Sequence, residues 1–326
     1  MDKNILITSA GKRVSLVRIF QEALRKLSLQ AKVYTTDMKP EMAPAGFVSD
    51  GCFKVPRVTD DNYINRLIDI CYTHNIGLII PTIDTELALL AENKSLLREK
   101  GVEVIVSSTD FVCTCRDKRK ASALFQQLDI CIPEIRDKYH PKFPLFAKPY
   151  DGSLSKDIYV IRNSEELTPE IMQHPKLIFM EYIDKTQYKE FTVDMYYGKD
   201  NKAKAIIPRE RVEIRAGEIN KGYTRKNHLV SFLKERMDYI PGVVGCICIQ
   251  LFYNEMTHKV FGIEINPRFG GGYPLSYYAG ANFPEFLLRE YFLNESLSYT
   301  DGWKDNTLML RYDSEVIVYE EEGVRF

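Results

Sequence analysis

The N-terminal part of the chain alternates short apolar runs with amphipathic stretches of helical period. Asn4–Thr8 predicts a buried strand, and after a turn at Gly11 the stretch Val14–Leu27 predicts a helix. Lys32–Thr36 predicts a second strand that ends at Asp37. This order opens a dinucleotide-binding fold, although that fingerprint needs three glycines where this turn has one. The alternative that we favour is a helix N-terminus facing a small anionic ligand.

The same alternation continues through a second βα unit. Tyr63–Asn75 predicts a helix, and Gly77–Pro81 predicts a strand. A helix over Glu86–Glu99 and a strand over Val102–Val106 follow. The acidic turn Thr82–Glu86 lies at the carboxyl end of a buried strand, where open α/β sheets bind ligands. The turn serves equally well as the N-cap of the next helix, and both roles stay open.

Short strands with polar connections dominate the middle of the chain. A cationic cluster, Asp117–Lys120, opens a helix, and Lys142–Ala147 predicts a strand that delivers Lys148 to its end. The loop Lys148–Asp157 is rich in small residues, and Ile158–Ile161 predicts the returning strand. Backbone N–H groups and hydroxyls of such a loop can close over phosphates, with the lysine as a point charge. An ordinary polar hairpin loop is the alternative.

Two further strands are joined by a hinge. Leu177–Met180 predicts a strand that leaves through Glu181–Ile183, and Glu190–Asp194 begins the next one. Exposed backbone groups at such a hinge can read an adenine edge, and a nearby glutamate can hold ribose hydroxyls. The alternative is a pair of edge strands with charged outer faces.

A β-hairpin near the C-terminal third carries three oxygen-bearing side chains. Its predicted strands are Cys246–Tyr253 and Lys259–Asn266. A turn centred on Thr257 sets Gln250 opposite Glu264 and places Asn266 on the same face, because side chains alternate along a strand. Hard oxygen ligands on one face suit Mg²⁺ that also binds phosphates. A solvated polar sheet face is the alternative.

The segments around this hairpin have weaker patterns. Pro208–Asn227 is polar and basic with little apolar periodicity, which predicts a mobile loop able to close over a charged substrate, or a solvated disordered one. Helices are expected at His228–Met237 and Pro284–Leu293, and Leu308–Tyr319 alternates like a strand. Arg268 follows the hairpin, and three consecutive glycines then let the backbone turn away sharply.

Composition narrows the class of protein. The 326 residues carry a net charge of −1, which gives no general attraction to nucleic acid or to an anionic membrane. No apolar run is long enough to span a bilayer, and the N-terminus lacks a secretory signal pattern. The seven cysteines have neither zinc nor redox spacing. These features predict a cytoplasmic protein with reduced thiols.

Taken in order, these pieces resemble the ATP-grasp superfamily, and most closely small stand-alone proteins similar to one synthetase half of the carbamoyl phosphate synthase large subunit. The resemblance covers nearly the whole chain and is carried by the N-terminal strand–turn–helix and five motifs. The motifs are Asp117-Lys118, Phe146-Ala147-Lys148-Pro149, Met180-Glu181-Tyr182-Ile183, Glu190-Phe191-Thr192-Val193-Asp194 and Glu264-Ile265-Asn266-Pro267-Arg268.

The resemblance implies a mixed α/β (α+β) fold. It implies a Rossmann-like pre-ATP-grasp domain over residues 1–110, followed by a two-lobed ATP-grasp domain with antiparallel sheets. The small lobe with the phosphate flap would span residues 111–183, and the large lobe with the metal-binding hairpin would span residues 184–326. The family also implies small-molecule carboxylate and amine substrates, and it favours a homodimer.

The resemblance also implies a role for each site residue. ATP phosphates would meet Lys118, Lys148, Ser153 and Ser155. Glu181, Tyr182 and Ile183 would hold adenine, and Glu190 would hold ribose. Two Mg²⁺ ions, with Mn²⁺ as a substitute, would bind Gln250, Glu264 and Asn266, with Glu264 bridging them. Arg268 would meet the transferred phosphoryl group or the acyl phosphate, assisted by Arg209 or Arg211.

These roles imply an ADP-forming carboxylate–amine ligase that acts through an acyl phosphate. Two departures bear on this: Lys156-Asp157 stands where the flap usually has a glycine, and the chain carries no glutaminase or second synthetase half. Making carbamoyl phosphate is therefore not expected. The alternatives are an NAD(P)-dependent oxidoreductase built on the N-terminal domain and a non-catalytic ATP-binding protein.

Overall fold

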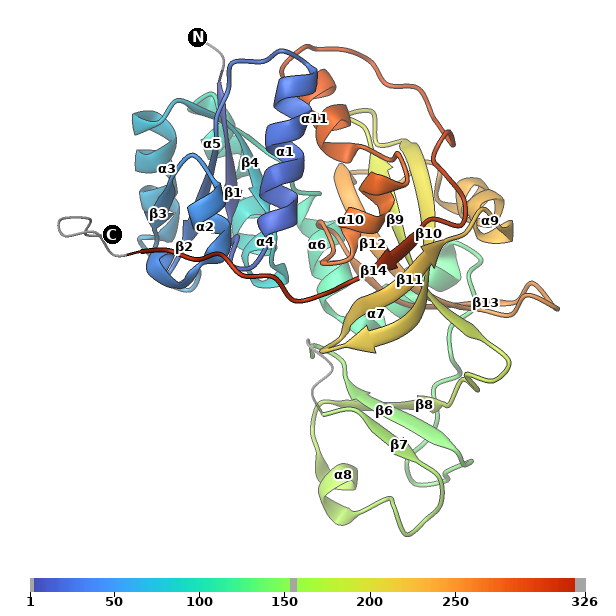
Figure 1. Cartoon of the computed structure of the whole chain (residues 1–326). Coiled ribbons are helices and arrows are strands. Elements are labelled where there is room, and N and C mark those ends of the chain that lie inside the picture. The colour runs from blue at the N-terminus through green and yellow to red at the C-terminus, as the bar shows by residue number, and fades with distance from the viewer. Residues whose placement is uncertain (1–2, 153–156, 320–326) are drawn as a thin grey trace.

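A computed structural model describes residues 3–152 and 157–319, and three β-sheets organise them (Figure 1). The N-terminal sheet is parallel and five-stranded, which confirms the predicted α/β opening. Its strand order is β3 (Cys52–Lys54), β2 (Val33–Asp37), β1 (Asn4–Thr8), β4 (Ile76–Pro81) and β5 (Glu103–Val104).

Helices cover both faces of this sheet because its central strands are apolar on both sides. Ile5 and Ile7 pack in one core with α1 (Val14–Lys26), whereas Leu6 packs on the opposite face with α3 (Tyr63–Thr73). The remaining helical segments of the domain are η1 (Pro40–Met42), α2 (Pro44–Val48), α4 (Asp84–Glu92) and α5 (Lys94–Glu99). The single helix expected over Glu86–Glu99 is therefore two helices, which meet at Asn93.

The smallest sheet is antiparallel and stands apart from the N-terminal sheet (Figure 1). Its order is β7 (Tyr159–Ile161), β6 (Leu145–Pro149) and β8 (Leu177–Glu181), and α8 (Pro169–Gln173) follows β7 in the chain. Its own core is small, with four buried residues among those that the structure describes.

The largest sheet is antiparallel and six-stranded. Its order is β13 (Val260–Asn266), β12 (Gly245–Tyr253), β9 (Lys189–Tyr197), β10 (Ala203–Arg215), β11 (Glu218–Thr224) and β14 (Leu308–Leu310). One face packs against α6 (Thr109–Arg116), α7 (Lys118–Gln127) and α9 (His228–Met237). The other packs against α10 (Tyr273–Tyr278), α11 (Phe283–Tyr291) and α1.

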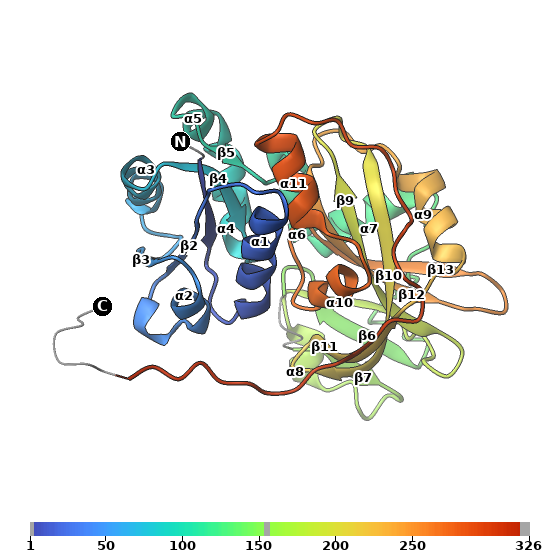
Figure 2. The ribbon, with the colours of Figure 1, turned by 45° about the horizontal axis from the view of Figure 1, so that its top comes forward.

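Helix α1 joins the N-terminal domain to the large sheet. Its buried side chains share one core with the N-terminal strand β1, with Tyr196 and Ile207 of the large sheet and with Phe283 of α11. Figure 2 shows α1 and α11 side by side between the two sheets. This shared core fixes the N-terminal turns against the large sheet. No helix among the described residues is long and apolar enough to cross a membrane.

Two expectations for the second half of the chain were wrong. Pro208–Asn227 is not a loop, because β10 and β11 form a long hairpin that turns at Ala216 and Gly217, both with positive φ. The first seven residues of β10 are buried, and cross-strand ion pairs such as Lys221–Glu213 explain the polar composition of the rest. Of the predicted strand Leu308–Tyr319, only Leu308–Leu310 pairs with β11.

Candidate functional site

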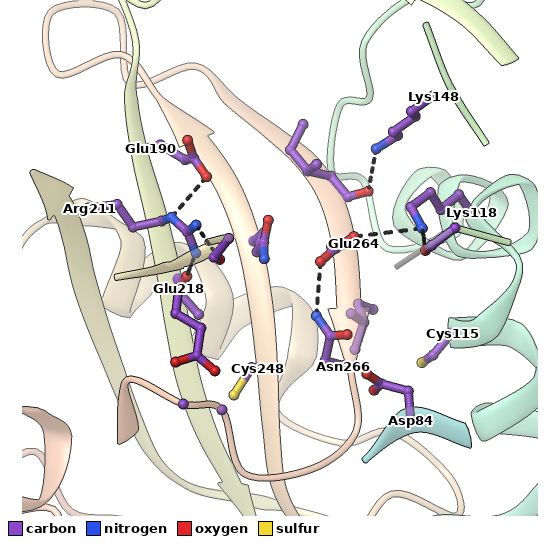
Figure 3. Close-up of a pocket in the computed structure, with 18 of the residues that line it drawn as sticks. Asp84, Cys115, Lys118, Lys148, Glu190, Arg211, Glu218, Cys248, Glu264 and Asn266 are labelled. Atoms are coloured by element: carbon purple, nitrogen blue, oxygen red, sulfur yellow. Dashed lines mark hydrogen bonds and ion pairs between the residues drawn. The ribbon is translucent and has the colours of Figure 1, made fainter. Parts of the chain in front are cut away.

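A cavity of about 850 Å³ opens where the three sheets meet. Its walls come from the N-terminal turns, the ends of β6 and β8, and one face of the large sheet (Figure 3). Every described residue to which the sequence assigned a role at the site lines this cavity. Ser153 and Ser155 lie outside the described residues.

The β12–β13 hairpin has the predicted pairing at the site. Gln250 lies opposite Glu264, and Cys248 lies opposite Asn266. Between Gln250 and Leu251 the register shifts, so that Phe252 pairs with Phe261 on the turn side. The predicted register therefore holds on the cavity side of this irregularity and is displaced by one residue on the turn side.

Glu264 is the centre of the oxygen-bearing face. Its Oε1 accepts a hydrogen bond from Asn266 Nδ2 at 3.1 Å, and its Oε2 lies 3.9 Å from Lys118 Nζ. This lysine is the closest cation to the carboxylate among the described residues, and at that distance it neutralises the charge only in part. Gln250 faces Glu264 across the strands, so a carboxylate and two amides gather there. This donor set fits a hard cation such as Mg²⁺.

Two lysines approach this face from the opposite wall. Lys148, at the end of β6, is 6% exposed, and its Nζ lies 3.4 Å from the Ile263 carbonyl. Burial lowers the pKa of Lys148 to about 8, with Glu264 opposing this shift and Lys118 adding to it. Lys118 Nζ donates to the Gly152 carbonyl at 2.6 Å. This wall therefore holds concentrated positive charge that lacks full counter-charges.

The hinge and the next strand form a third side of the cavity. The Glu181 N–H donates to the Glu134 carbonyl at 2.8 Å, while the Glu181 side chain accepts from the Glu134 N–H at 3.0 Å. Tyr182 and Ile183 follow along the cavity wall. Glu190, on β9, lies 2.9 Å from Arg211 Nε. This ion pair fixes the carboxylate on the sheet face.

Arg209 and Arg211 lie on the same face of β10 but have different surroundings. Arg211 donates to Thr192 Oγ1 and to the Gly217 carbonyl, both at 3.0 Å, so it is held at the cavity wall. Arg209 is 1% exposed and forms a two-bond ion pair with Asp194 at 2.7 and 2.8 Å. Burial acts to lower the pKa of Arg209, but Asp194 outweighs it and the pKa is raised.

The glycine run after Arg268 lies against this buried ion pair. A Cβ at Gly272 would stand 2.3 Å from Arg209 Nη1, and one at Gly270 would stand 2.9 Å from Cys248 Sγ. Neither glycine has a positive φ. Close approach of the backbone, rather than the sharp turn that we expected, is therefore what requires glycine here.

The acidic turn of the N-terminal domain divides its two proposed roles between two residues. Asp84 lines the cavity and accepts a hydrogen bond from Arg268 Nη2 at 2.7 Å. Glu86 is fully buried and accepts from the N–H groups of Thr82 and Ile83 at 2.8 and 3.2 Å, so it holds the start of α4. Burial raises the pKa of Glu86.

Sequence reasoning missed two charged residues of the cavity as individual site residues. Arg13 stands just before α1, and Glu218 begins β11. Arg13 belongs to the turn expected to face a small anion, which was the available signal. Glu218 lay in the stretch read as a loop, so no pattern indicated its direction.

Comparisons with known proteins agree with this architecture. Residues 173–309 match a family model described as ATP-grasp in the biosynthetic pathway with Ter operon. The biotin carboxylase domain of Hydrogenobacter thermophilus 2-oxoglutarate carboxylase, solved with MgADP, ADP and bicarbonate, superposes with a TM-score of 0.69. It is 16% identical, over 94% of this chain and 74% of that one. Residues 173–309 thus match an ATP-grasp family, and the chain as a whole has the ATP-grasp fold. The predicted superfamily is thereby confirmed.

Other ATP-grasp structures match over a similar span. Staphylococcus aureus N5-carboxyaminoimidazole synthetase with ADP gives a TM-score of 0.70 at 16% identity, covering 91% of this chain and 79% of that one. Bacillus licheniformis L-amino acid ligase gives 0.65 at 16% identity, covering 89% and 74%. Residues 5–105 of this chain match a PylC-like N-terminal domain. No curated protein sequence matches it.

Proposed function

We propose that the protein is an ATP- and Mg²⁺-dependent, ADP-forming ligase that joins a small-molecule carboxylate to an amine. The γ-phosphoryl group of ATP would pass to a carboxylate oxygen, giving an acyl phosphate and ADP. The amine nitrogen would then attack the acyl carbon, and phosphate would leave as the amide forms and the nitrogen loses a proton. Such chemistry depends on positioning and charge neutralisation more than on a protein nucleophile.

The observation that carries this proposal is the arrangement around Glu264. A carboxylate flanked by two amides faces two lysines across a cavity large enough for a nucleotide. Lys148 is buried near Glu264 without a carboxylate at hydrogen-bonding distance among the described residues. A buried cation is costly unless it is paired, so this wall favours a bound polyanion such as a triphosphate.

Gln250, Glu264 and Asn266 are the residues that we propose hold Mg²⁺. Their oxygens suit a hard cation, and the partial neutralisation of Glu264 by Lys118 leaves negative charge for it. We propose two ions bridged by Glu264, with Mn²⁺ as a substitute. The metal would neutralise the negative charge of the γ-phosphoryl group during its transfer. Glu264, Gln250 and Asn266 would direct their side-chain oxygens towards the wall that carries Lys118 and Lys148.

The nucleotide would occupy the space between the small lobe and the large sheet. We propose that Lys118, Lys148, Ser153 and Ser155 contact phosphates, that Glu181 to Ile183 hold adenine, and that Glu190 holds ribose. Glu190 is fixed by Arg211, which gives it the orientation that such a contact needs. The ADP bound in two structural neighbours supports a nucleotide in this fold.

The arginines take different parts in the proposal. Arg268 and Arg211 line the cavity and would stabilise the phosphoryl group or the acyl phosphate. We propose that Arg209, whose Nε and Nη2 are both bonded to Asp194, mainly supports the sheet under the glycine run. Its contribution to the reaction would then be to position the backbone after Arg268.

The remaining features of the proposal follow the resemblance. We propose a pre-ATP-grasp domain over residues 1–110, a small lobe over 111–183 and a large lobe over 184–326. We further propose a homodimer located in the cytoplasm, without nucleic-acid or membrane partners. The seven cysteines are unpaired, as expected of a reducing compartment.

The test is ADP release from Mg²⁺-ATP with pools of carboxylates and amines, with Glu264→Gln beside the wild type. We expect ADP only with particular acid–amine pairs, and a loss of about 100-fold or more in the variant, because the charge that holds the metal is gone. Glu99→Gln, on the exposed end of α5, is the matched control and should keep the wild-type rate.

Other outcomes would overturn the ligase proposal. A wild-type rate in Glu264→Gln would remove the hairpin from the chemistry. Binding of Mg²⁺-ATP without ADP formation in any pool would indicate a non-catalytic ATP-binding protein. Binding of NAD(P) in place of ATP would favour the oxidoreductase alternative.

A further inference from the structure

One end of the cavity carries charges that phosphate or metal binding does not use. These charges are Arg13 and Asp84 of the N-terminal domain and Glu218 of the β10–β11 hairpin, and Asp84 pairs with Arg268, the arginine proposed to meet the phosphoryl group. In Figure 3, Glu218 and Lys148 lie at opposite corners of the site. This end therefore differs from the phosphate wall by holding both signs of charge.

Arg13 is a cation without a carboxylate partner in the described part of the chain. Its one side-chain hydrogen bond there is from Nη2 to the Thr82 carbonyl at 3.3 Å. Burial lowers the pKa of Arg13, and the nearby Arg268 lowers it further, while Glu218 and Asp84 oppose the shift. An arginine fork with free donors at a cavity wall is suited to a carboxylate.

Glu218 has the complementary character. Its Oε2 accepts from Arg311 Nη1 at 2.7 Å and lies 3.9 Å from Lys12 Nζ, whereas Oε1 has no hydrogen-bond donor among the described residues. Gly271 leaves room for this oxygen, since a Cβ there would stand 2.2 Å from it. Arg311 and Arg13 hold the pKa of Glu218 below its usual value against the effect of burial, which keeps the carboxylate ionised.

Two buried atoms beside this pair also lack partners. Asp84 Oδ1 and Arg268 Nε are inaccessible and have no hydrogen-bond partner in residues 3–152 and 157–319. Buried polar atoms are nearly always satisfied, so this acceptor and donor show that the polar network at this end of the cavity is incomplete among the described residues. A purely anionic ligand would be repelled by Glu218, and a purely cationic one by Arg13.

We propose that this end of the cavity binds a small zwitterion, an α-amino acid, whose carboxylate contacts Arg13 and whose ammonium group contacts Glu218. The inference rests on the proposed ligase function and makes the amino acid one of its two substrates. The metal and triphosphate contacts stay with the Glu264 face and with Lys118 and Lys148. The substrate would thereby be recognised by residues from two domains.

Three matched pools test the inference: the twenty common L-amino acids, the deaminated acids with the same side chains, and the corresponding primary amines. Each pool is added to the whole protein with Mg²⁺-ATP, and both thermal stabilisation and ADP release are measured. We expect the amino acids to act and their deaminated and decarboxylated analogues to act about 10- to 100-fold more weakly, because each analogue leaves a charged group of the site unpaired.

Variants assign the two charges. Arg13→Gln should weaken the response to amino acids about 10- to 100-fold, whereas Arg18→Gln, on the exposed face of the helix that follows Arg13, should not. Glu218→Gln should reduce the preference for amino acids over deaminated acids. Arg311→Gln breaks the ion pair between Arg311 and Glu218, as Glu218→Gln does, but it keeps the Glu218 carboxylate. It should therefore preserve that preference.

Several results would overturn the inference while leaving the ligase proposal standing. These are binding of Mg²⁺-ATP together with an equal or stronger response to deaminated acids or to amines, or ADP formation with other acid–amine pairs and no response to any of the three pools. Equal effects of Arg311→Gln and Glu218→Gln on the preference would mean that Glu218 has only a structural role. Failure to bind Mg²⁺-ATP would instead contradict the proposed function itself.

Discussion

One face of the large sheet has two halves that carry similar residues in different surroundings. In the open half, Glu190 of β9, Arg211 of β10 and Gln250 of β12 line the cavity. In the closed half, Asp194 lies four residues from Glu190 on β9 and Arg209 lies two residues from Arg211 on β10, and the two form a buried ion pair. Since strand periodicity places both halves on the same face, what separates them is the covering of the closed half.

The covering comes from a distant part of the chain. Ser276 of α10 donates to Asp194 Oδ2 at 2.5 Å, and Cys248 Sγ donates to Asp194 Oδ1 at 3.0 Å. With the two bonds from Arg209, the Asp194 carboxylate is fully satisfied. A complete set of partners therefore makes charges structural, whereas an incomplete set leaves them available to a ligand.

The largest effect is expected on the free energy of unfolding, when one charge is removed from the closed half. Asp194→Asn should lower the free energy of unfolding by about 3–5 kcal/mol, because it leaves a buried guanidinium without its counter-charge. Urea denaturation would measure the loss. The double variant Asp194→Leu with Arg209→Met should lose less, since neither charge remains. A larger loss in the double variant would contradict this account.

A smaller effect is expected when each of the two arginines, Arg211 and Arg209, is replaced by lysine. Arg211→Lys should raise the KM for ATP about tenfold, because lysine cannot reproduce the forked contacts to Glu190, Thr192 and the Gly217 carbonyl. The matched change Arg209→Lys should act mainly on the free energy of unfolding. Steady-state kinetics and denaturation of both variants check this. The reverse distribution of effects would show that the two halves are not distinct.

The smallest expected effect is a dependence of nucleotide binding on pH. Lys148 has a pKa of about 8 when folded and 10.5 as its ordinary value. The unfolded chain therefore binds more protons between these values, so the lysine destabilises the fold below pH 8 and ceases to do so as the pH rises to 10.5.

Because phosphates need the charged form, the affinity for Mg²⁺-ATP should fall above pH 8, by at most about tenfold per pH unit. Titrations from pH 7 to 9.5 would measure this. Lys148→Met should bind more weakly and without that decline. An equal decline in the variant would assign it to another group.

Much of the fold could be predicted from local pattern. The N-terminal strands are continuous apolar runs, and the β12–β13 hairpin alternates clearly, so their positions and the pairing of Gln250 with Glu264 followed from the sequence. The β10–β11 hairpin was missed because its outer half is exposed and mostly charged, so that the two apolar residues there, Val212 and Ile214, predict no buried face.

The site was predictable only where neighbours in sequence are neighbours in space. Gln250, Glu264 and Asn266 belong to one hairpin, so their convergence could be derived from strand geometry. Asp84 and Arg268 meet across two domains, and the ion pair between them depends on how α1 packs against the large sheet. No local pattern encodes such a contact.

The irregularity between Gln250 and Leu251 changes the register of the hairpin by one residue. The turn at Asn254–His258 sets one register. One additional residue in β13 then shifts the register before the strands reach the cavity. Without this shift, a one-residue slip would turn Glu264 away from the cavity. A change in the length of the exposed turn can therefore leave the site unchanged, provided that the register shift changes to compensate for it.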